Sequence, residues 1–444
     1  MSTTLDSPSL AADSRPASAT SEESSGAVSR FLSNLWRGAL MKTLERFQLG
    51  QLHLEFPDGT TKILGGEADS GPQAHITIAS EDFFKKCALY GNVGLGEAYM
   101  DGDWETPDIR SALEWFIVNL HADEEAKGSS QRLKLVGFLR TLDRIGHRLR
   151  PNTKKMSRRN IEEHYDLGND FYKLWLDSTM TYSCGRYTSP DESLESAQFA
   201  KYDALCQKLK LTAEDHVLEI GCGWGGFALH AVKNYGCRVT GVTISQAQYE
   251  EAIQRIREAG LEDRIEIRLQ DYRDITGQFD KIVSIEMLEA VGDRYLETWC
   301  AKCHEVLAPE GLLAVQMITV PDCDHAELKR GADFIQKHIF PGSLLLSVGR
   351  MNQAMNRTGN LFLHGLEDIG TSYTRTLREW HDAFNARRDE VSAQGFSDRF
   401  IRKWNYYLKC CEAAFATRNI SVVQGVYTRP ANQRTLHRED GVLS

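Results

Sequence analysis

The segment His216–Gly226, "HVLEIGCGWGG", decides the fold of this 444-residue chain. A short, mostly apolar run leads directly into a turn with glycines at 221, 223, 225 and 226. A buried strand followed by a glycine-rich turn and a helix is typical of a doubly wound α/β domain, in which ligands bind beyond the carboxyl ends of the strands. The segment therefore predicts a Rossmann-like domain with a binding site at Gly221 and Gly223.

The segments that follow support an α/β domain with a mostly parallel sheet. Helical patterns such as "SQAQYEEAIQRIREAG" separate short apolar runs of strand length, and this alternation is typical of parallel strands joined by crossover helices. The expected strands cover residues 216–220, 238–244, 264–271, 280–288 and 311–319.

The region before this domain has a different composition. Residues 1–28 contain almost no large apolar side chains, which predicts a disordered tail. Residues 29–121 predict a smaller α+β domain, with two strands around the turn "PDGT" at 57–60. We expect residues 122–159 to form a linker and residues 160–444 to form the α/β domain.

The linker contains a basic amphipathic segment. Residues 132–159 contain ten Lys or Arg and one Asp, and Leu135, Leu139 and Leu142 fall on one helical face. This pattern is typical of a helix lying on an anionic membrane surface. A helix that packs on its own protein and exposes a basic side would show the same pattern, so both interpretations stay open.

Composition restricts the other classes of function. The net charge of -10 argues against nucleic-acid binding, and we expect a cytoplasmic protein because neither a signal peptide nor a long apolar run is present. The motif "CAKCH" at 300–304 resembles a haem attachment site, but it lies on a predicted helix of a chain without an export signal. We expect no metal site.

The glycine turn has the spacing Glu-x-Gly-x-Gly, which is the form seen in S-adenosylmethionine-dependent methyltransferases. In that interpretation Gly221 and Gly223 lie against the methionyl and ribose groups of the cofactor, with Asp271 and Tyr272 near the adenine. The second strand lacks the usual acidic residue for the ribose. The candidate polar contacts there are Thr243 and Gln248.

Several motifs resemble the cyclopropane fatty acid synthases, which include the mycolic acid cyclopropane synthases. The similarity covers residues 160 to about 428, and residues 29–121 resemble the N-terminal domain of the phospholipid-acting members. It implies transfer of a methylene group from S-adenosylmethionine to a cis double bond of an unsaturated phospholipid acyl chain, at the inner face of the membrane. A homodimer is a family expectation. The motifs are "NIEEHYDLGNDFYKLWLDSTMTYSCGRY", "VLEIGCGWGGFA", "GVTISQAQ", "DYRD", "FDKIVSIEMLEAVG", "HIFPGS", "SYTRTLREW" and "WNYYLKCCEAAF".

The resemblance also implies a bound bicarbonate that acts as the base. Glu289, Tyr373 and backbone groups of Cys184 and Ile318 match the residues that hold this ion in the family. The carboxylate of Glu289 would accept a hydrogen bond from the bicarbonate hydroxyl and so orient the ion.

Three further positions come from the same motifs. Tyr182 and Ser183 match residues next to the sulfonium group of the cofactor. Cys411 matches a cysteine long labelled as the active-site residue of the family, although the mechanism requires no thiol, and we expect it to serve packing.

Two departures from the family bear on the product. Gln316 stands where many members have His, and Ala290 follows Glu289 where they have Glu-His. Unlike histidine, the amide of Gln316 cannot carry a proton, which alters the polarity around the carbocation. The product can then be a cyclopropane ring or a methyl- or methylene-branched chain. Residues 320–370 predict a helical insertion that lines the acyl site. A small-molecule amine methyltransferase and a non-catalytic lipid-binding protein stay open as alternatives.

Overall fold

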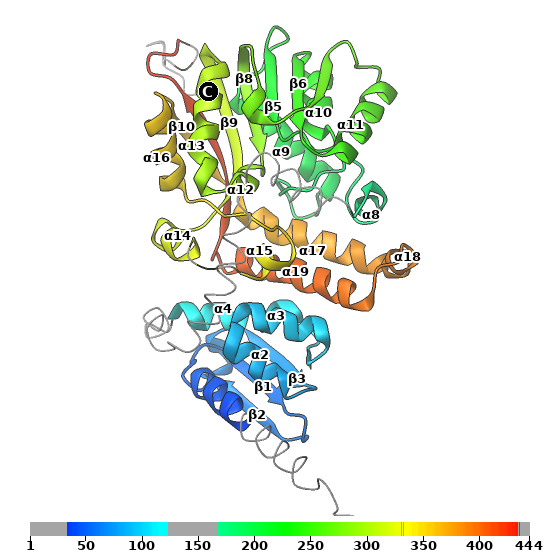
Figure 1. Cartoon of the computed structure of the whole chain (residues 1–444), viewed down its shortest axis with the longest axis vertical. Coiled ribbons are helices and arrows are strands. Elements are labelled where there is room, and N and C mark those ends of the chain that lie inside the picture. The colour runs from blue at the N-terminus through cyan, green and yellow to red at the C-terminus, as the bar shows by residue number, and fades with distance from the viewer. Residues whose placement is uncertain (1–32, 123–166, 330, 332, 434, 436–444) are drawn as a thin grey trace, which may run out of the picture.

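The computed structural model describes residues 33–122, 167–329, 331, 333–433 and 435. A small N-terminal domain and a larger sheet domain lie at opposite ends of the molecule, and helices α17 (Gly370–Ala386) and α19 (Asp398–Ala416) lie between them (Figure 1). The predicted tail and the basic segment 132–159 fall outside the described residues.

The N-terminal domain is an α+β unit, as predicted. After a helix over residues 33–44, its four strands form a sheet in the order β2-β1-β3-β4, in which β1 pairs with β2 antiparallel and with β3 parallel. Its elements are β1 (Gln51–Glu55), β2 (Thr61–Gly65), β3 (Gln73–Ile78), α2 (Asp82–Tyr90), α3 (Asn92–Asp101), β4 (Trp104–Glu105) and α4 (Ile109–Ala122).

The predicted turn joins β1 to β2. Oδ1 of Asp58 accepts a hydrogen bond from the backbone N of Thr60 at 2.9 Å. Gly59 has a φ of +77°, which glycine adopts without steric cost. The hairpin therefore forms from turn chemistry that is local in sequence.

The sheet of the larger domain has seven strands in the order β10-β11-β9-β8-β5-β6-β7. The five strands from β9 to β7 are parallel to one another, while β11 is antiparallel to both β9 and β10. This mostly parallel sheet confirms the predicted fold class. Its strands are β5 (His216–Ile220), β6 (Arg238–Thr243), β7 (Ile265–Leu269), β8 (Phe279–Ile285), β9 (Leu307–Thr319), β10 (Phe362–Asp368) and β11 (Ser421–Thr428).

The direction of chain progression reverses between β5 and β8. From β5 the chain continues to β6 and β7 on one side of the sheet and then returns to β8 and β9 on the other. The carboxyl ends of β5 and β8 therefore flank a crevice, which is where open α/β sheets bind ligands.

The end of β8 differs from the prediction. The strand was expected to reach residue 288, but it ends at Ile285 because Glu286 has a left-handed backbone with a φ of +47°. A short helix, α12 (Leu288–Val291), follows.

Helices cover the sheet and form the segment between β9 and β10 (Figure 1). The predicted helical insertion 320–370 requires a correction, because its last part is the edge strand β10, which pairs with β11. The remaining helices are α8 (Asn169–Lys173), α9 (Leu194–Lys208), α10 (Gly226–Tyr235), α11 (Gln246–Glu258), α13 (Leu296–Val306), α14 (Asp322–Leu328), α15 (Phe334–His338), α16 (Val348–Thr358) and α18 (Arg388–Ala393).

Helix α19 holds the two domains together. The fully buried carboxylate of Glu412 accepts hydrogen bonds from Arg110 of α4 at 3.0 Å, from Arg378 of α17 at 3.2 Å and from Lys409 at 2.8 Å. A buried carboxylate with several cationic donors is much more stable than an unpaired one, so this cluster favours one relative placement of the domains.

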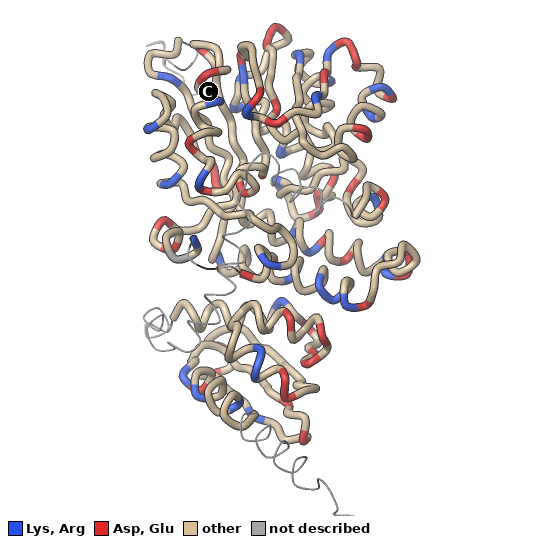
Figure 2. The backbone as a smooth tube through the Cα atoms, viewed as in Figure 1, with Lys and Arg blue, Asp and Glu red and all other residues tan. Residues whose placement is uncertain are grey.

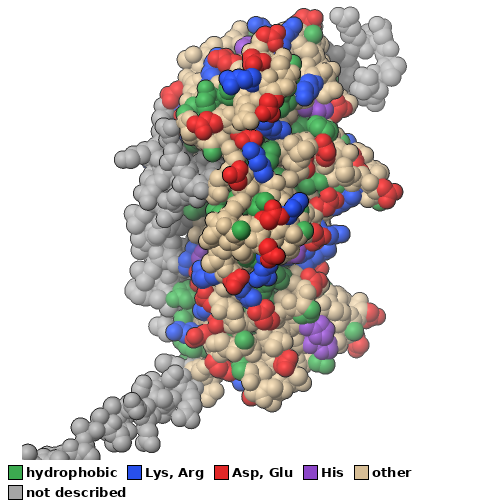
Figure 3. Space-filling view, turned by 90° about the vertical axis from the view of Figure 1, so that its right-hand side faces the viewer, with side chains coloured by type: hydrophobic (Ala, Val, Ile, Leu, Met, Phe, Trp, Pro, Cys, Tyr) green, Lys and Arg blue, Asp and Glu red, His purple; other side chains and the backbone are tan. Residues whose placement is uncertain are grey.

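The molecular surface is mixed in charge. Basic and acidic side chains are distributed over both domains, and they are interspersed on the face in the space-filling view (Figures 2 and 3). Among the helices that the structure describes, none has the length and apolar character needed to cross a membrane.

Candidate active site

A cavity of about 1210 Å³ begins at the glycine turn and reaches the N-terminal domain. Every predicted site residue except Cys184 and Gln316 lines it. Those two lie behind the cavity wall, where they contact Glu286. The structure thus brings the predicted residues together around one space.

The glycine turn after β5 forms the first part of the wall. Gly221 has a φ of +85° and Gly223 a φ of +51°, conformations that residues with a side chain rarely adopt. A Cβ atom at Gly221 would lie 2.6 Å from the side chain of Met287. Glycine at position 221 therefore keeps the wall of the cavity open beside the strand ends.

The polar residues predicted for the cofactor lie around the same part of the cavity. Thr243 at the end of β6 donates a hydrogen bond to Oε1 of Gln248 at 2.9 Å, so the two side chains form one polar unit. Asp271 is held by Arg273 through contacts of 2.8 and 2.6 Å, and Tyr272 lies beside it on the wall.

Glu286 is the central residue of the site, and it is not among the residues predicted from the sequence. Its Oε1 accepts hydrogen bonds from the backbone N of Cys184 at 2.9 Å and from Nε2 of Gln316 at 2.8 Å. Its Oε2 accepts one from the hydroxyl of Tyr373 at 2.7 Å. The available signal was an acidic residue directly after an apolar strand at the reversal point of the sheet.

Gln316 connects this carboxylate to a buried polar chain. Its Oε1 accepts from Nε2 of Gln424 at 2.9 Å, and Oε1 of Gln424 accepts from Nζ of Lys208 at 2.7 Å. Because Gln424 fixes which end of the Gln316 amide is the acceptor, the Nε2 group must face Glu286 as a donor.

Glu289 lies near Glu286 but has a different environment. Its Oε1 accepts from the backbone N of Ile318 at 2.6 Å, while its buried Oε2 has no hydrogen-bond partner among the described residues. Burial, followed by the charge of Glu286, raises the pKa of Glu289 to about 8. Burial also raises the pKa of Glu286, but the three donors oppose that rise.

A buried lysine lies behind the predicted sulfonium contacts. Nζ of Lys201 donates to Oγ of Ser183 at 2.8 Å and to Oε1 of Gln198 at 2.7 Å. Burial lowers the pKa of Lys201 to about 8. On the cavity wall, the hydroxyl of Tyr182 is 2.7 Å from that of Tyr407.

The two cysteines among the predicted residues are free thiols, buried at Cys184 and half-buried at Cys411. Burial raises the pKa of Cys184 and of Cys411 well above the ordinary value. The Sγ atom of Cys184 donates to the carbonyl of Gly185 at 3.1 Å. Neither residue has the electropositive environment that produces a reactive thiolate.

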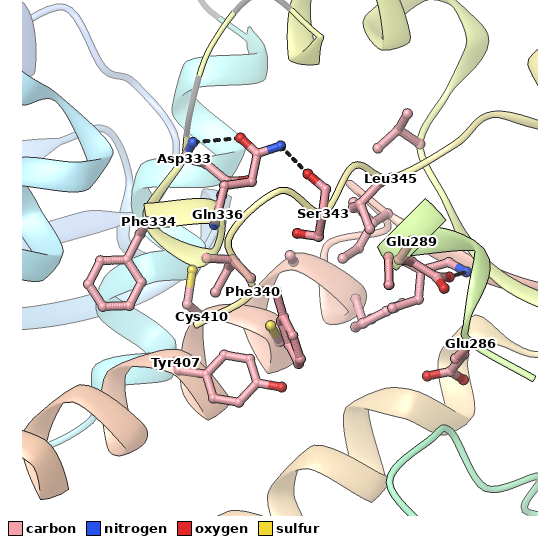
Figure 4. Close-up of a pocket in the computed structure, with 18 of the residues that line it drawn as sticks. Glu286, Glu289, Asp333, Phe334, Gln336, Phe340, Ser343, Leu345, Tyr407 and Cys410 are labelled. Carbon is pink, nitrogen blue, oxygen red and sulfur yellow. Dashed lines mark hydrogen bonds between the residues drawn. The ribbon is translucent and has the colours of Figure 1, made fainter. Parts of the chain in front are cut away.

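The far part of the cavity is apolar. Phe340, Tyr407 and Cys410 face this part of the space, with Glu286 and Glu289 on its other side (Figure 4). From the predicted insertion 320–370, the apolar side chains of Phe334, Ile335, Phe340 and Leu345 line the cavity. Beyond them, the N-terminal domain contributes Trp36, Leu40, Leu44, Phe47, Phe116 and Ile117.

The two small molecules implied by the sequence differ in how well they fit. The glycine turn, whose wall a Cβ would close, and the polar groups at Thr243, Gln248 and Asp271 fit S-adenosylmethionine, which supplies an electrophilic methyl group. Bicarbonate does not fit. The donors at Cys184 and Tyr373 are already bound to the carboxylate of Glu286.

The structure also joins Glu289 directly to the backbone of Ile318. Glu289 was expected to orient bicarbonate, and the backbone of Ile318 to hold it. Instead, the backbone N of Ile318 donates to Glu289 itself.

Comparisons with known proteins identify the family of this chain. The family model described as mycolic acid cyclopropane synthetase matches residues 152–425. The cyclopropane-fatty-acyl-phospholipid synthase of Escherichia coli strain K12 is 38% identical over 357 residues, which cover 80% of this chain and 88% of that protein. The tuberculostearic acid methyltransferase UfaA1 of Mycobacterium tuberculosis strain H37Rv is 34% identical and covers 85% of this chain and 88% of its own.

Solved structures give the same result for the larger domain. The cyclopropane synthase MmaA2 from Mycobacterium tuberculosis aligns with a TM-score of 0.57 and 29% identity, covering 61% of this chain and 98% of that one. The mycolic acid cyclopropane synthase CmaA1, solved in complex with SAH and CTAB, has the same TM-score and coverage at 28% identity. The chain belongs to the mycolic acid cyclopropane synthetase family and is an S-adenosylmethionine-dependent methyltransferase.

Proposed function

We propose that this protein transfers a methylene group from S-adenosylmethionine to the cis double bond of an unsaturated phospholipid acyl chain and forms a cyclopropane ring. One observation carries the proposal: a single cavity connects the glycine turn, two enclosed carboxylates and a long apolar part. An acyl chain needs such an apolar space, with its double bond beside the methyl donor.

The substrate reaches this cavity from a membrane surface. We place the enzyme at the cytoplasmic face of the membrane, where the basic segment 132–159 would bind anionic lipids. The apolar residues that the N-terminal domain contributes to the cavity support its role in holding the lipid.

The chemistry requires alignment of the reactants and tolerance of positive charge. The alkene attacks the sulfonium methyl group, so positive charge develops on the acyl chain. Tyr182 and Ser183 would lie next to the sulfonium, and the ring of Tyr182, which packs 5.2 Å from that of Trp380, can face a cation. The apolar wall excludes water that would trap the cation.

A methyl-branched product is the second candidate. The 34% identical relative named tuberculostearic acid methyltransferase supports it, as does Gln316, an amide that cannot take up a proton. Ring closure requires loss of a proton from the transferred methyl group as the second carbon–carbon bond forms. A methylene branch requires a hydride shift to the neighbouring carbon before that proton is lost, and a saturated methyl branch requires a hydride donor as an additional reductant.

Incubation with S-adenosylmethionine and liposomes of a monounsaturated phospholipid tests both candidates. Mass spectrometry of the fatty esters should show the mass gain of one methylene group. Nuclear magnetic resonance would then distinguish a cyclopropane from a methyl or methylene branch. An unchanged fatty ester profile would refute the lipid function.

Two further measurements test membrane binding and assembly. Flotation with anionic liposomes should carry the protein to the lipid layer, whereas an amine methyltransferase would stay in solution. Light scattering tests the family expectation of a homodimer.

A further inference from the structure

We propose that the carboxylate of Glu286 occupies the anion position of this enzyme and is itself the base, so that catalysis does not depend on bicarbonate. This inference rests on the proposed function for its chemistry. The placement of the carboxylate can be tested without it.

The contacts of Glu286 are those of a bound anion. A backbone N–H from residue 184, a side-chain amide from β9 and a hydroxyl from α17 converge on the two carboxylate oxygens at 2.7 to 2.9 Å. A carboxylate offers about four acceptor positions. The three contacts leave about one acceptor position, and Glu286 lines the cavity where the substrate would bind.

The backbone of Glu286 adopts a costly conformation to place this side chain. Its φ of +47° is unfavourable for a residue with a Cβ, yet its N–H is fixed by a hydrogen bond of 2.8 Å to the carbonyl of Gln316. Strained non-glycine residues that persist in a folded protein cluster at functional sites. A glutamate in this conformation, with its carboxylate enclosed, fits that pattern.

The two neighbouring carboxyl groups have environments that separate their roles. Glu286 has three donors, whereas Glu289 has one donor on Oε1 and, within the part of the chain that the structure describes, none on its buried Oε2. Two enclosed carboxyl groups repel each other when both are ionised, so one of them keeps its proton. The proton stays on the group that accepts fewer hydrogen bonds, because hydrogen-bond donors stabilise the ionised form. Glu289 is then the protonated member of the pair, and Glu286 is the ionised one that can accept a proton.

The proposed step is balanced in atoms and electrons. The alkene electron pair forms a bond to the methyl carbon, and the carbon–sulfur bond breaks with its electrons going to sulfur. Glu286 then accepts one proton of the former methyl group, and the electrons of that C–H bond form the second carbon–carbon bond of the ring. The proton on Glu286 returns to solvent after product release.

Two variants of Glu286 separate the functions of charge and space. Glu286→Gln keeps the volume and removes the base, so the turnover rate should fall by about 10²- to 10⁴-fold, and added bicarbonate should not restore it. Glu286→Gly removes the whole side chain and suits the left-handed backbone. Its anion position is then empty, so activity should be absent in buffer freed of carbon dioxide and should return with bicarbonate.

The turnover rate of the wild-type enzyme should change less than about twofold when bicarbonate is added to the same buffer, since its base is part of the protein. Glu258→Gln, an exposed carboxyl on α11 bonded to Gln254, is the matched control and should behave like the wild type. A wild-type enzyme that stops without bicarbonate and recovers with it would overturn the proposal. So would a Glu286→Gln variant with wild-type turnover.

Binding of ¹³C-bicarbonate, followed by nuclear magnetic resonance, gives a result that needs no activity. The wild type should bind none at the site, and Glu286→Gly should bind one equivalent. Bicarbonate bound by the wild type, or none bound by a folded glycine variant, would contradict the inference. If no protein modifies lipid but this binding pattern holds, the proposed function fails while the placement of Glu286 stands.

Discussion

Replacing Glu289 by glutamine should reduce the dependence of stability on pH. The wild-type carboxyl is enclosed, has a single donor on Oε1, and has an Oε2 without a partner among the described residues. Its pKa is raised from the ordinary value of 4.5 to about 8 by burial and by the charge of Glu286. Glutamine has the shape of the protonated acid and does not ionise.

The sign of the effect follows from proton binding. The pKa of Glu289 is about 8 in the folded protein and 4.5 as an ordinary carboxyl, so between these values the folded protein holds a proton that the unfolded chain has lost. The stability that this proton contributes is fully present below about pH 4.5 and is lost as the pH rises through about 8. Each pKa unit corresponds to about 1.36 kcal/mol. Between about pH 5 and about pH 9, the wild type should lose on the order of 4 kcal/mol that the Glu289→Gln variant keeps.

Urea unfolding at about pH 5, 7 and 9 measures this difference. Glu258→Gln is the control, because it is the same substitution at an exposed position on α11. The informative quantity is the free energy of unfolding of the variant minus that of the wild type, since other titrating groups cancel in it. If this difference stayed constant over the pH range, our placement of Glu289 in an enclosed, poorly solvated position would be wrong.

Three further substitutions test other parts of the structure. Cys184→Ala should keep most of the activity and cost about 1 kcal/mol of stability, because only the backbone N of this residue contacts Glu286; lipid turnover and urea unfolding test both parts. A Cβ at Gly96 would lie 2.4 Å from the ring of Phe334 on the cavity wall, so Gly96→Val should displace this ring. The variant should turn over lipid more slowly and lose about 1–3 kcal/mol of the free energy of unfolding. Its affinity for the cofactor, measured by calorimetry, should not change. Glu412→Gln leaves Arg110, Arg378 and Lys409 without their buried carboxylate. The variant should lose roughly 3 kcal/mol of the free energy of unfolding and have a lower thermal midpoint. An unchanged midpoint would show that this cluster does not hold the domains together.

The architecture could be predicted from the sequence because its signals are local. The strand at 216–220 and the glycines after it are adjacent in the chain, and alternating apolar runs and helices require a parallel sheet. The hairpin at 57–60 likewise follows from a turn whose hydrogen bond spans two residues. These features depend on neighbours along the chain, which a sequence displays directly.

The position of the Glu286 carboxylate depends on contacts between distant segments of the chain. The partners of Glu286 lie 102, 30 and 87 residues away, at Cys184, Gln316 and Tyr373. Motif positions identified those three partners but not what they bind. Only the folded chain shows that a protein carboxylate lies where a free ion was expected.

The sequence by itself therefore determined the sheet, the glycine turn and many of the residues that line the cavity. The tertiary structure decided that the cavity reaches the N-terminal domain and that Glu286, rather than Glu289, receives the converging donors. The physical reason is that a carboxylate takes its role from the donors and the burial around it, and both are supplied by segments that meet only when the chain folds.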